Sequence, residues 1–315
     1  MQRIIRRTNI MNHRLNTWLI FLFLTIFTLA TIYPVLNILS ISLRTDNAFQ
    51  SKSLSFWEYD EPYVDQNENG IRDSDESFTD VNSNGSWDRG SGFQSFKILF
   101  TATPFLRWAW NSFLVTLVVT LTGVVLASTA GYALSRFNFM GKQFTMVSLL
   151  TTQMFPATML LLPFFILLSK LGLINSYGGL IIIYSSTALP FCIWQMKGYY
   201  DTIPPSLEEA ARLDGCSRFS AFYRIILPLS APALVITALF SFMASWNEYV
   251  VAAIVLQDPE LYTLPLGLKS FQASLSTQWG LYAAGAVLVS IPVAVLFISL
   301  AKYLVSGLTM GSVKG

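Results

Sequence analysis

The chain has few charged residues and a single histidine, and both shortages reduce the number of function classes that it can belong to. Only 12% of its 315 residues are charged, against about 25% in ordinary soluble domains. The one histidine, His13, stands near a basic N-terminus, which removes most routes to histidine-based catalysis or a zinc site. Two cysteines, Cys192 and Cys216, fall in an apolar stretch and in a polar loop, so no disulfide between them is expected.

A nucleotide-binding loop is also absent. The chain contains no Gly-x-x-x-x-Gly-Lys-Ser/Thr motif, the phosphate cradle of many ATPases, so it cannot hydrolyse ATP by that chemistry. Its apolar segments hold no clustered pair of acids, which argues against a membrane enzyme.

Apolar sequence, by contrast, is plentiful, at 53% of the residues. Six stretches are long enough to cross a hydrocarbon core about 30 Å thick. Because backbone groups inside a bilayer must bond within their own segment, we predict an all-α polytopic membrane protein with six transmembrane helices. The predicted spans are residues 18–43, 111–134, 145–168, 177–196, 231–256 and 282–304.

The orientation follows from the basic residues. The first apolar run lasts about 25 residues, longer than the core of a cleavable signal peptide, so we expect a retained first span. Four arginines precede it, and basic residues in the second and fourth connections outnumber those in the third and fifth. Both termini are therefore predicted to be cytoplasmic.

The predicted organisation has three parts. Residues 1–44 form a cytoplasmic N-terminus and the first span, residues 45–109 an extracytoplasmic loop, and residues 110–315 a transmembrane core with a cytoplasmic loop at about 199–229. Of the 18 acidic residues, 11 lie between Asp46 and Asp88. The extracytoplasmic loop thus carries a small acidic insert at about residues 60–91.

The cytoplasmic loop predicts a short helix over residues 206–214. Pro204 and Pro205 precede Ser206, which has Glu209 three places on, as in a capping box. Gly215 suits the left-handed position after a helix end.

The faces of this helix differ in character. Glu208 and Arg212 are spaced to form an ion pair, while Leu207, Ala210 and Ala211 form a small apolar face. Such a face suits docking into a groove of another protein, and an ordinary helical connector is the alternative.

A resemblance favours docking. The loop contains a spaced set of residues, namely Glu209-Ala210-Ala211, Gly215, Ile225 and Leu227-Pro228. This set resembles the loop signature of membrane permeases of ATP-binding-cassette (ABC) importers, where a coupling helix inserts into a cleft on a cytoplasmic ATPase. The resemblance implies that Glu209 meets a basic residue on the ATPase. The implied docking residues are Glu208, Glu209, Ala210, Ala211, Arg212, Asp214 and Gly215.

Other motifs resemble the smaller of the two permeases of maltose-type importers. They include Asn111-Ser112-Phe113, Gly131-Tyr132-Ala133-Leu134-Ser135-Arg136, Trp246-Asn247-Glu248 and the tail at residues 307–315. The resemblance covers residues 15–45 and 105–315 but not the acidic insert.

This branch implies a type I ABC importer permease fold in a bacterial inner membrane. The implied partners are a second permease, an ATPase dimer that binds ATP and Mg²⁺, an extracytoplasmic solute-binding protein, a sugar and membrane lipid, with no nucleic acid. It also implies that Thr309, Gly311 and Lys314 reach between the ATPase subunits.

Polar residues within a span are functional candidates by default. Trp246, Asn247 and Glu248 lie about two thirds along the fifth predicted span. A hydrogen-bonded structural role and a place on the solute path both fit Glu248.

The acidic insert holds two copies of a pattern that fits the twelve-residue calcium loop. The first copy offers Asp65, Asn67, Asn69, Ile71, Asp73 and Glu76 as ligands, and the second offers Asp80, Asn82, Asn84, Ser86 and Asp88. The second copy has Ser91 at the twelfth position, where the bidentate acid belongs. A Ca²⁺ ion would order a segment with little core of its own, and a flexible loop without metal is the alternative.

Two other functions remain open at this point. One is a calcium-dependent, membrane-anchored structural or interaction protein, which leaves the coupling signature and the tail unexplained. The other is an importer permease for a solute other than a sugar.

Overall fold

The computed structural model describes residues 2–43, 61–64, 66, 72–80, 85, 87, 93–272 and 277–310. The chain divides into two compact units, one of residues 1–102 with 271–288 and one of residues 103–270 with 289–315. Within the described residues every regular element is helical, apart from the isolated bridges Tyr63–Phe78 and Gln272–Thr277. The expected all-helical membrane architecture is therefore confirmed.

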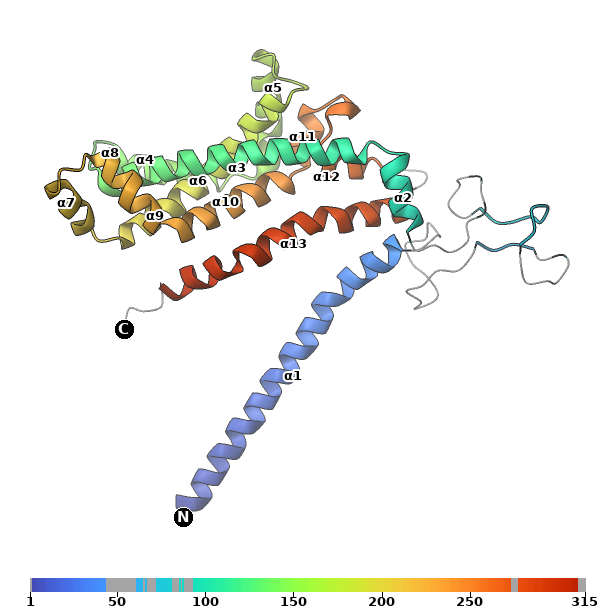
Figure 1. The fold of residues 1–315 in the computed structure, drawn as a ribbon, viewed down its shortest axis with the longest axis horizontal. Coiled ribbons are helices and arrows are strands. Elements are labelled where there is room, and N and C mark those ends of the chain that lie inside the picture. Colours follow the sequence, from blue (N-terminus) through green and yellow to red (C-terminus); the bar gives the residue numbers. More distant parts are fainter. Residues whose placement is uncertain are drawn as a thin grey trace. The chain divides into compact units, whose positions relative to one another are not determined.

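Three long helices form the centre of the larger unit (Figure 1). They are α3 (Phe105–Arg136), α6 (Tyr177–Thr202) and α10 (Ala231–Trp246). Small residues allow the close approach, as is usual between membrane helices. A Cβ atom on Gly131 of α3 would lie 2.9 Å from Cβ of Met196 on α6, and one on Gly123 would lie 2.6 Å from Oγ of Ser241 on α10.

Four described helices are long and apolar enough to cross a membrane: Thr17–Ser42, Phe105–Arg136, Tyr177–Thr202 and Trp279–Tyr303. A fifth crossing results if Arg218–Leu229 and Ala231–Trp246, bent by 77°, count as one span. The first and last of these helices belong to α1 (Gln2–Ser42) and α13 (Trp279–Met310).

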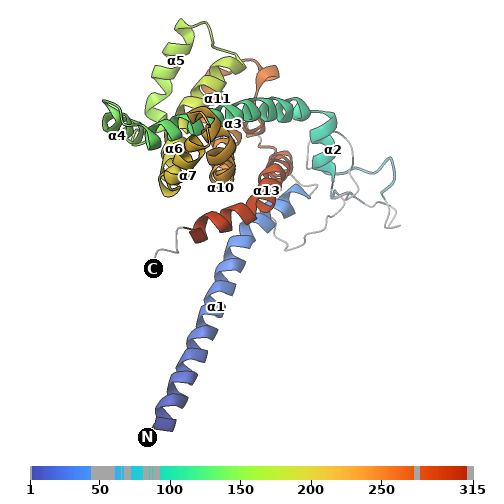
Figure 2. The ribbon, with the colours of Figure 1, turned by 60° about the vertical axis from the view of Figure 1, so that its left-hand side comes forward.

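The third predicted span, residues 145–168, is not one continuous helix. It contains α4 (Lys142–Thr152), a 3-10 turn (Ala157–Leu160) and α5 (Leu161–Lys170). The break falls at Pro156, whose ψ of 130° is extended and whose ring removes a backbone donor. In both views α5 projects steeply from α3 (Figure 1, Figure 2).

The fifth predicted span, residues 231–256, is also interrupted. After α10, helix α11 (Val250–Val255) starts anew. The Glu248 carboxylate accepts hydrogen bonds from the backbone N–H groups of Val251 at 3.0 Å and Ala252 at 3.3 Å. This carboxylate caps α11. Glu248, the acid within the fifth predicted span, therefore stabilises the interruption between α10 and α11.

The smaller unit contains α1, α2 (Gln94–Thr101) and the first part of α13. Ser95 of α2 lies so close to Gly280 that a Cβ atom there would meet its Oγ at 2.6 Å. Leu99, Ala283 and Ala284 are buried in this unit.

Candidate functional site

The loop after α6, predicted to be cytoplasmic, folds around α7 (Ser206–Leu213). The capping-box prediction is wrong, because Pro205 already has helical φ and ψ angles and occupies the cap position, where no side chain bonds to the helix. Backbone N–H groups of Glu208 and Glu209 instead bond to the Pro205 carbonyl at 3.0 and 3.1 Å. The helix is entered through a proline, whose fixed φ is already helical.

The predicted end of α7 is confirmed. Gly215 has a φ of +88°, the left-handed region that favours glycine. Its N–H donates to the Arg212 carbonyl at 3.1 Å, and the Cys216 N–H donates to the Ala211 carbonyl at 2.9 Å. These two bonds form a Schellman motif, which turns the chain toward α8 (Arg218–Ala221).

Helix α8 begins at a capping serine and runs without a gap into further helical turns. Ser217 Oγ accepts the N–H of Ser220 at 3.2 Å. A π-helix (Phe222–Ile226) and α9 (Leu227–Leu229) follow.

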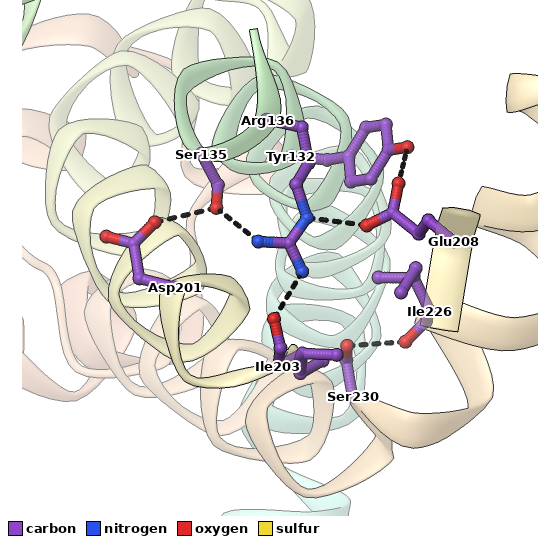
Figure 3. Close-up of polar contacts among 8 residues, drawn as sticks. All are labelled: Tyr132, Ser135, Arg136, Asp201, Ile203, Glu208, Ile226 and Ser230. Carbon is purple, nitrogen blue, oxygen red and sulfur yellow. Dashed lines mark hydrogen bonds and ion pairs between the residues drawn. The ribbon is translucent and has the colours of Figure 1, made fainter. Parts of the chain in front are cut away.

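The first turn of α7 is tied to the end of α3 by an ion pair (Figure 3). Arg136 Nε donates to Glu208 Oε1 at 2.5 Å, and the Tyr132 hydroxyl donates to Glu208 Oε2 at 2.6 Å. The Arg136 and Glu208 side chains are only 12% and 14% exposed. The predicted pair between Glu208 and Arg212 is therefore wrong, because a residue 72 positions earlier takes the carboxylate.

The same arginine also holds the residues that precede α7. Arg136 Nη2 donates to the Ile203 carbonyl at 2.7 Å, just before the two prolines. Its neighbour Ser135 donates to Asp201 Oδ1 at 2.6 Å, and Lys197 Nζ bonds to Asp201 Oδ2 at 2.5 Å. Arg136 thus bridges α3, the end of α6 and α7 (Figure 3).

The opposite side of α7 faces outward. Glu209, Ala210, Arg212 and Asp214 are exposed, and Leu213 is 89% exposed. The predicted apolar face divides, because Ala211 is buried at 6% whereas Leu207 is 42% exposed and lies with Ala210 on the accessible side. Two adjacent acids therefore have opposite surroundings, Glu208 turned inward and Glu209 outward.

Sequence reasoning missed Arg136 as a residue of this site. The available signals were its place in the motif that ends α3 and its position in a basic connection. Neither signal identifies Glu208 as its partner.

The three consecutive residues considered for the solute path have different surroundings in the structure. Trp246 is buried and its Nε1 donates to the Val289 carbonyl at 3.1 Å. Glu248 caps α11, as described above. Asn247 is exposed and lines a cavity of about 640 Å³ with mostly apolar neighbours, among them Phe240 and Met243.

The tail lies mostly outside the described residues. Thr309 belongs to the last turn of α13, whereas Gly311 and Lys314 lie outside the part that the structure describes. Their predicted role toward the ATPase stays a prediction.

Most of the predicted calcium ligands are likewise outside the described residues: Asp65, Asn67, Asn69, Ile71, Asn82, Asn84, Ser86 and Asp88. Asp73, Glu76 and Asp80 are described. Among the residues whose positions are given, no three His, Cys, Asp or Glu side chains are grouped to hold a metal ion.

The described part of the insert has contacts of its own among half-buried side chains. Residues Tyr63 and Phe78 pair, with Val64 N–H to the Ser77 carbonyl at 2.9 Å and Thr79 N–H to the Pro62 carbonyl at 2.8 Å. The Arg72 guanidinium lies 4.6 Å from the Phe78 ring and 5.4 Å from the Trp87 ring, the geometry of a cation–π contact.

Comparisons with known proteins place this architecture in a family. The family described as binding-protein-dependent transport system inner membrane component matches residues 119–310. The chain is 35% identical over 304 residues to the maltodextrin transport system permease protein MdxG of Bacillus subtilis, covering 96% of this chain and 97% of that protein. It is 34% identical to the maltose/maltodextrin transport system permease protein MalG of Salmonella typhimurium, covering 93% and 94%.

A solved bacterial ABC transporter involved in import of the acidic polysaccharide alginate has the same fold. Its matching chain superposes with a TM-score of 0.72 at 23% identity, covering 92% of this chain and 96% of that one. The expected resemblance to the smaller maltose-type permease is confirmed by the two sequence relatives. The chain belongs to the family of inner membrane components of binding-protein-dependent transport systems.

Proposed function

We propose that this chain forms half of the translocation pathway of an ABC importer for maltose-like oligosaccharides. The substrate class rests on the relatives, which are named for maltose or maltodextrin transport. A second permease, a pair of ATPase subunits and an extracytoplasmic binding protein complete the proposed assembly. ATP and Mg²⁺ bind to the ATPase subunits and not to this chain.

The topology proposed with it has six crossings and both termini in the cytoplasm of a bacterial cell. Residues 142–170 form the third crossing, which is broken. The bent pair of helical segments from α8 to α10 leads into the fifth crossing. Non-helical backbone at membrane depth is tolerated where protein covers it, and the second permease supplies that cover.

The observation that carries the proposal is the outward face of α7. Glu209, Ala210 and Arg212 are exposed on a short helix, and Asp214 and Gly215 are exposed just after its end. The inner side of the helix is held by Arg136 and Tyr132. A small convex helix on a fixed base suits insertion into a cleft of a partner protein. We propose this face as the docking surface for the ATPase.

The test is to express the tagged chain in its native host and identify the proteins that co-purify in mild detergent. A second permease and two ATPase copies are expected, and Glu209→Lys should lose the ATPase and oligosaccharide uptake. Glu209→Gln, which keeps the shape but not the charge, serves as the milder variant. Full ATPase recovery with Glu209→Lys would contradict the docking assignment, and uptake of only a non-sugar solute would contradict the substrate class.

For the acidic insert we also propose calcium binding, for which the two aligned twelve-residue patterns are the main support. At the twelfth position of the first loop, the buried Glu76 carboxylate accepts the N–H groups of Gln66 at 2.8 Å and Asp73 at 3.1 Å. The Glu76 carboxylate thus bonds to positions two and nine of its own loop.

The missing acid of the second loop has a candidate in Glu61, which is 2% exposed. Arg72, at position eight of the first loop, donates to the Glu76 carbonyl at 3.0 Å. Trp87, at position eight of the second loop, donates to the Glu61 carbonyl at 2.8 Å. The Glu61 carbonyl therefore stands to the second loop as the Glu76 carbonyl stands to the first.

Calorimetric titration of the purified chain with Ca²⁺ tests this part. Two ions per chain are expected for the unaltered protein and one for Glu61→Gln. Absence of any calcium heat would overturn the metal proposal and leave the transport proposal untouched.

A further inference from the structure

The two ends of the cytoplasmic loop are built differently. At its entry, the loop is held by Arg136, which bonds to both the Ile203 carbonyl and Glu208. The intervening Pro204 and Pro205 restrict the backbone further. At its exit, the chain passes through the π-helix Phe222–Ile226 and bends by 77° into α10.

A guanidinium is well suited to hold the entry. Its planar fork offers donors in fixed directions, so a single side chain can fix two acceptors relative to each other. Here the two acceptors belong to the end of α6 and to the first turn of α7. With both ionic side chains largely buried, the pair is shielded from solvent and salt.

The exit, by comparison, is bent and is packed by apolar contacts: Ile226 is buried and the Phe222 ring lies 4.5 Å from the Tyr132 ring. Single π-turns mark places where a helical ladder is disturbed. Ser230 returns its hydroxyl to the Ile226 carbonyl at 2.6 Å within the bend (Figure 3). Pro228 and Pro232 flank that bend and remove two backbone donors.

We propose that Arg136 is a positioning residue that makes α7 and the cytoplasmic ends of α3 and α6 move as one body. Displacement of α7 by the ATPase then reaches α3 through Glu208 and Arg136. Glu208 acts inside the permease, and its neighbour Glu209 acts toward the ATPase. This inference rests on the proposed docking of α7 to an ATPase.

The test uses the assembled importer with its binding protein in proteoliposomes, and measures oligosaccharide transported per ATP hydrolysed. Glu208→Gln and Glu209→Gln make the same chemical change at adjacent positions, so each is the control for the other. Glu208→Gln and Arg136→Gln should keep the ATPase subunits at the unaltered ratio but lower transport per ATP by about fivefold or more, as expected for loss of a coupling free energy. Glu209→Gln should instead reduce ATPase recovery.

Tyr132→Phe provides a variant that keeps the ring and removes only the hydroxyl bond to Glu208. It should lower transport per ATP by about twofold. Because this change is small, Tyr132→Phe still tests the inference if the Arg136→Gln protein does not accumulate. Unchanged transport per ATP in Glu208→Gln and Tyr132→Phe would overturn the inference, as would ATPase loss in Glu208→Gln equal to that in Glu209→Gln. Failure of Glu209→Lys to release the ATPase would count against the docking proposal instead.

Discussion

The loop at residues 199–229 and the acidic insert are both short charged segments between apolar helices, but they are stabilised in opposite ways. The loop depends on the helices of the membrane core, because Glu208 bonds to Arg136 and Tyr132 of α3. The insert relies on its own pairing of Tyr63 with Phe78 and on the Arg72 contacts with aromatic rings. A segment bonded to the core can transmit motion to it. A segment stabilised by its own contacts can be inserted or deleted without changing the core.

The largest expected effect comes from reversing a charge at the held end of the loop. Glu208→Lys places a second cation against Arg136, and disruption of a buried pair of this kind costs about 3–5 kcal/mol of stability. The free energy should appear as a lowered thermal midpoint of the purified chain in detergent. Glu209→Lys, at the exposed neighbouring position, should change stability by less than about 0.5 kcal/mol. Equal destabilisation by both variants would contradict the inward and outward assignment of the two acids.

A smaller and more local effect is expected from the insert. Trp87→Ala removes a ring that lies 5.8 Å from the Tyr63 ring in a T-shaped pair and bonds to the Glu61 carbonyl. We expect about 2 kcal/mol of local destabilisation, measured as faster proteolysis between residues 61 and 93. The thermal midpoint of the helical core should stay unchanged, and exposed Asp75→Ala should change neither reading. A shifted core midpoint would mean that the insert is not independent.

The smallest effect is expected from two serines of the loop at residues 199–229. Ser217→Ala removes a cap whose Oγ accepts the Ser220 N–H and should cost about 1 kcal/mol. Ser206→Ala should cost less than about 0.5 kcal/mol, because Ser206 caps nothing. Chemical denaturation of both variants in the same detergent compares the two costs. A larger loss of stability from Ser206→Ala than from Ser217→Ala would support the capping box and contradict the start of α7 at Pro205.

Local signals in the sequence were sufficient for part of this picture. Apolar length predicted the helices, and Gly215 predicted the end of α7, because both depend on residues close together in the chain. The outward Glu209 was identified through a spaced motif of the same local kind. The breaks at Pro156 and at residues 247–249 were missed, since hydropathy averages over the few residues at which backbone bonding changes.

The partner of Glu208 could not be predicted for a different reason. Helix spacing favoured Arg212, four residues away, and that choice ignores any cation brought near by folding. Arg136 reaches the carboxylate only because α3 and α6 pack closely at Gly131, where a side chain would collide with Met196. A contact of this range requires the helix packing itself.

The interrupted third segment has a consequence for the fate of an unassembled copy. In the chain taken singly, Met154 and Phe155 at the break are 81% and 57% exposed. Non-helical backbone that faces lipid is costly, so a copy without the proposed second permease would present a defect inside the bilayer. We expect membrane-bound proteases to degrade such a copy, so that the cellular amount of this subunit follows the amount of the proposed second permease.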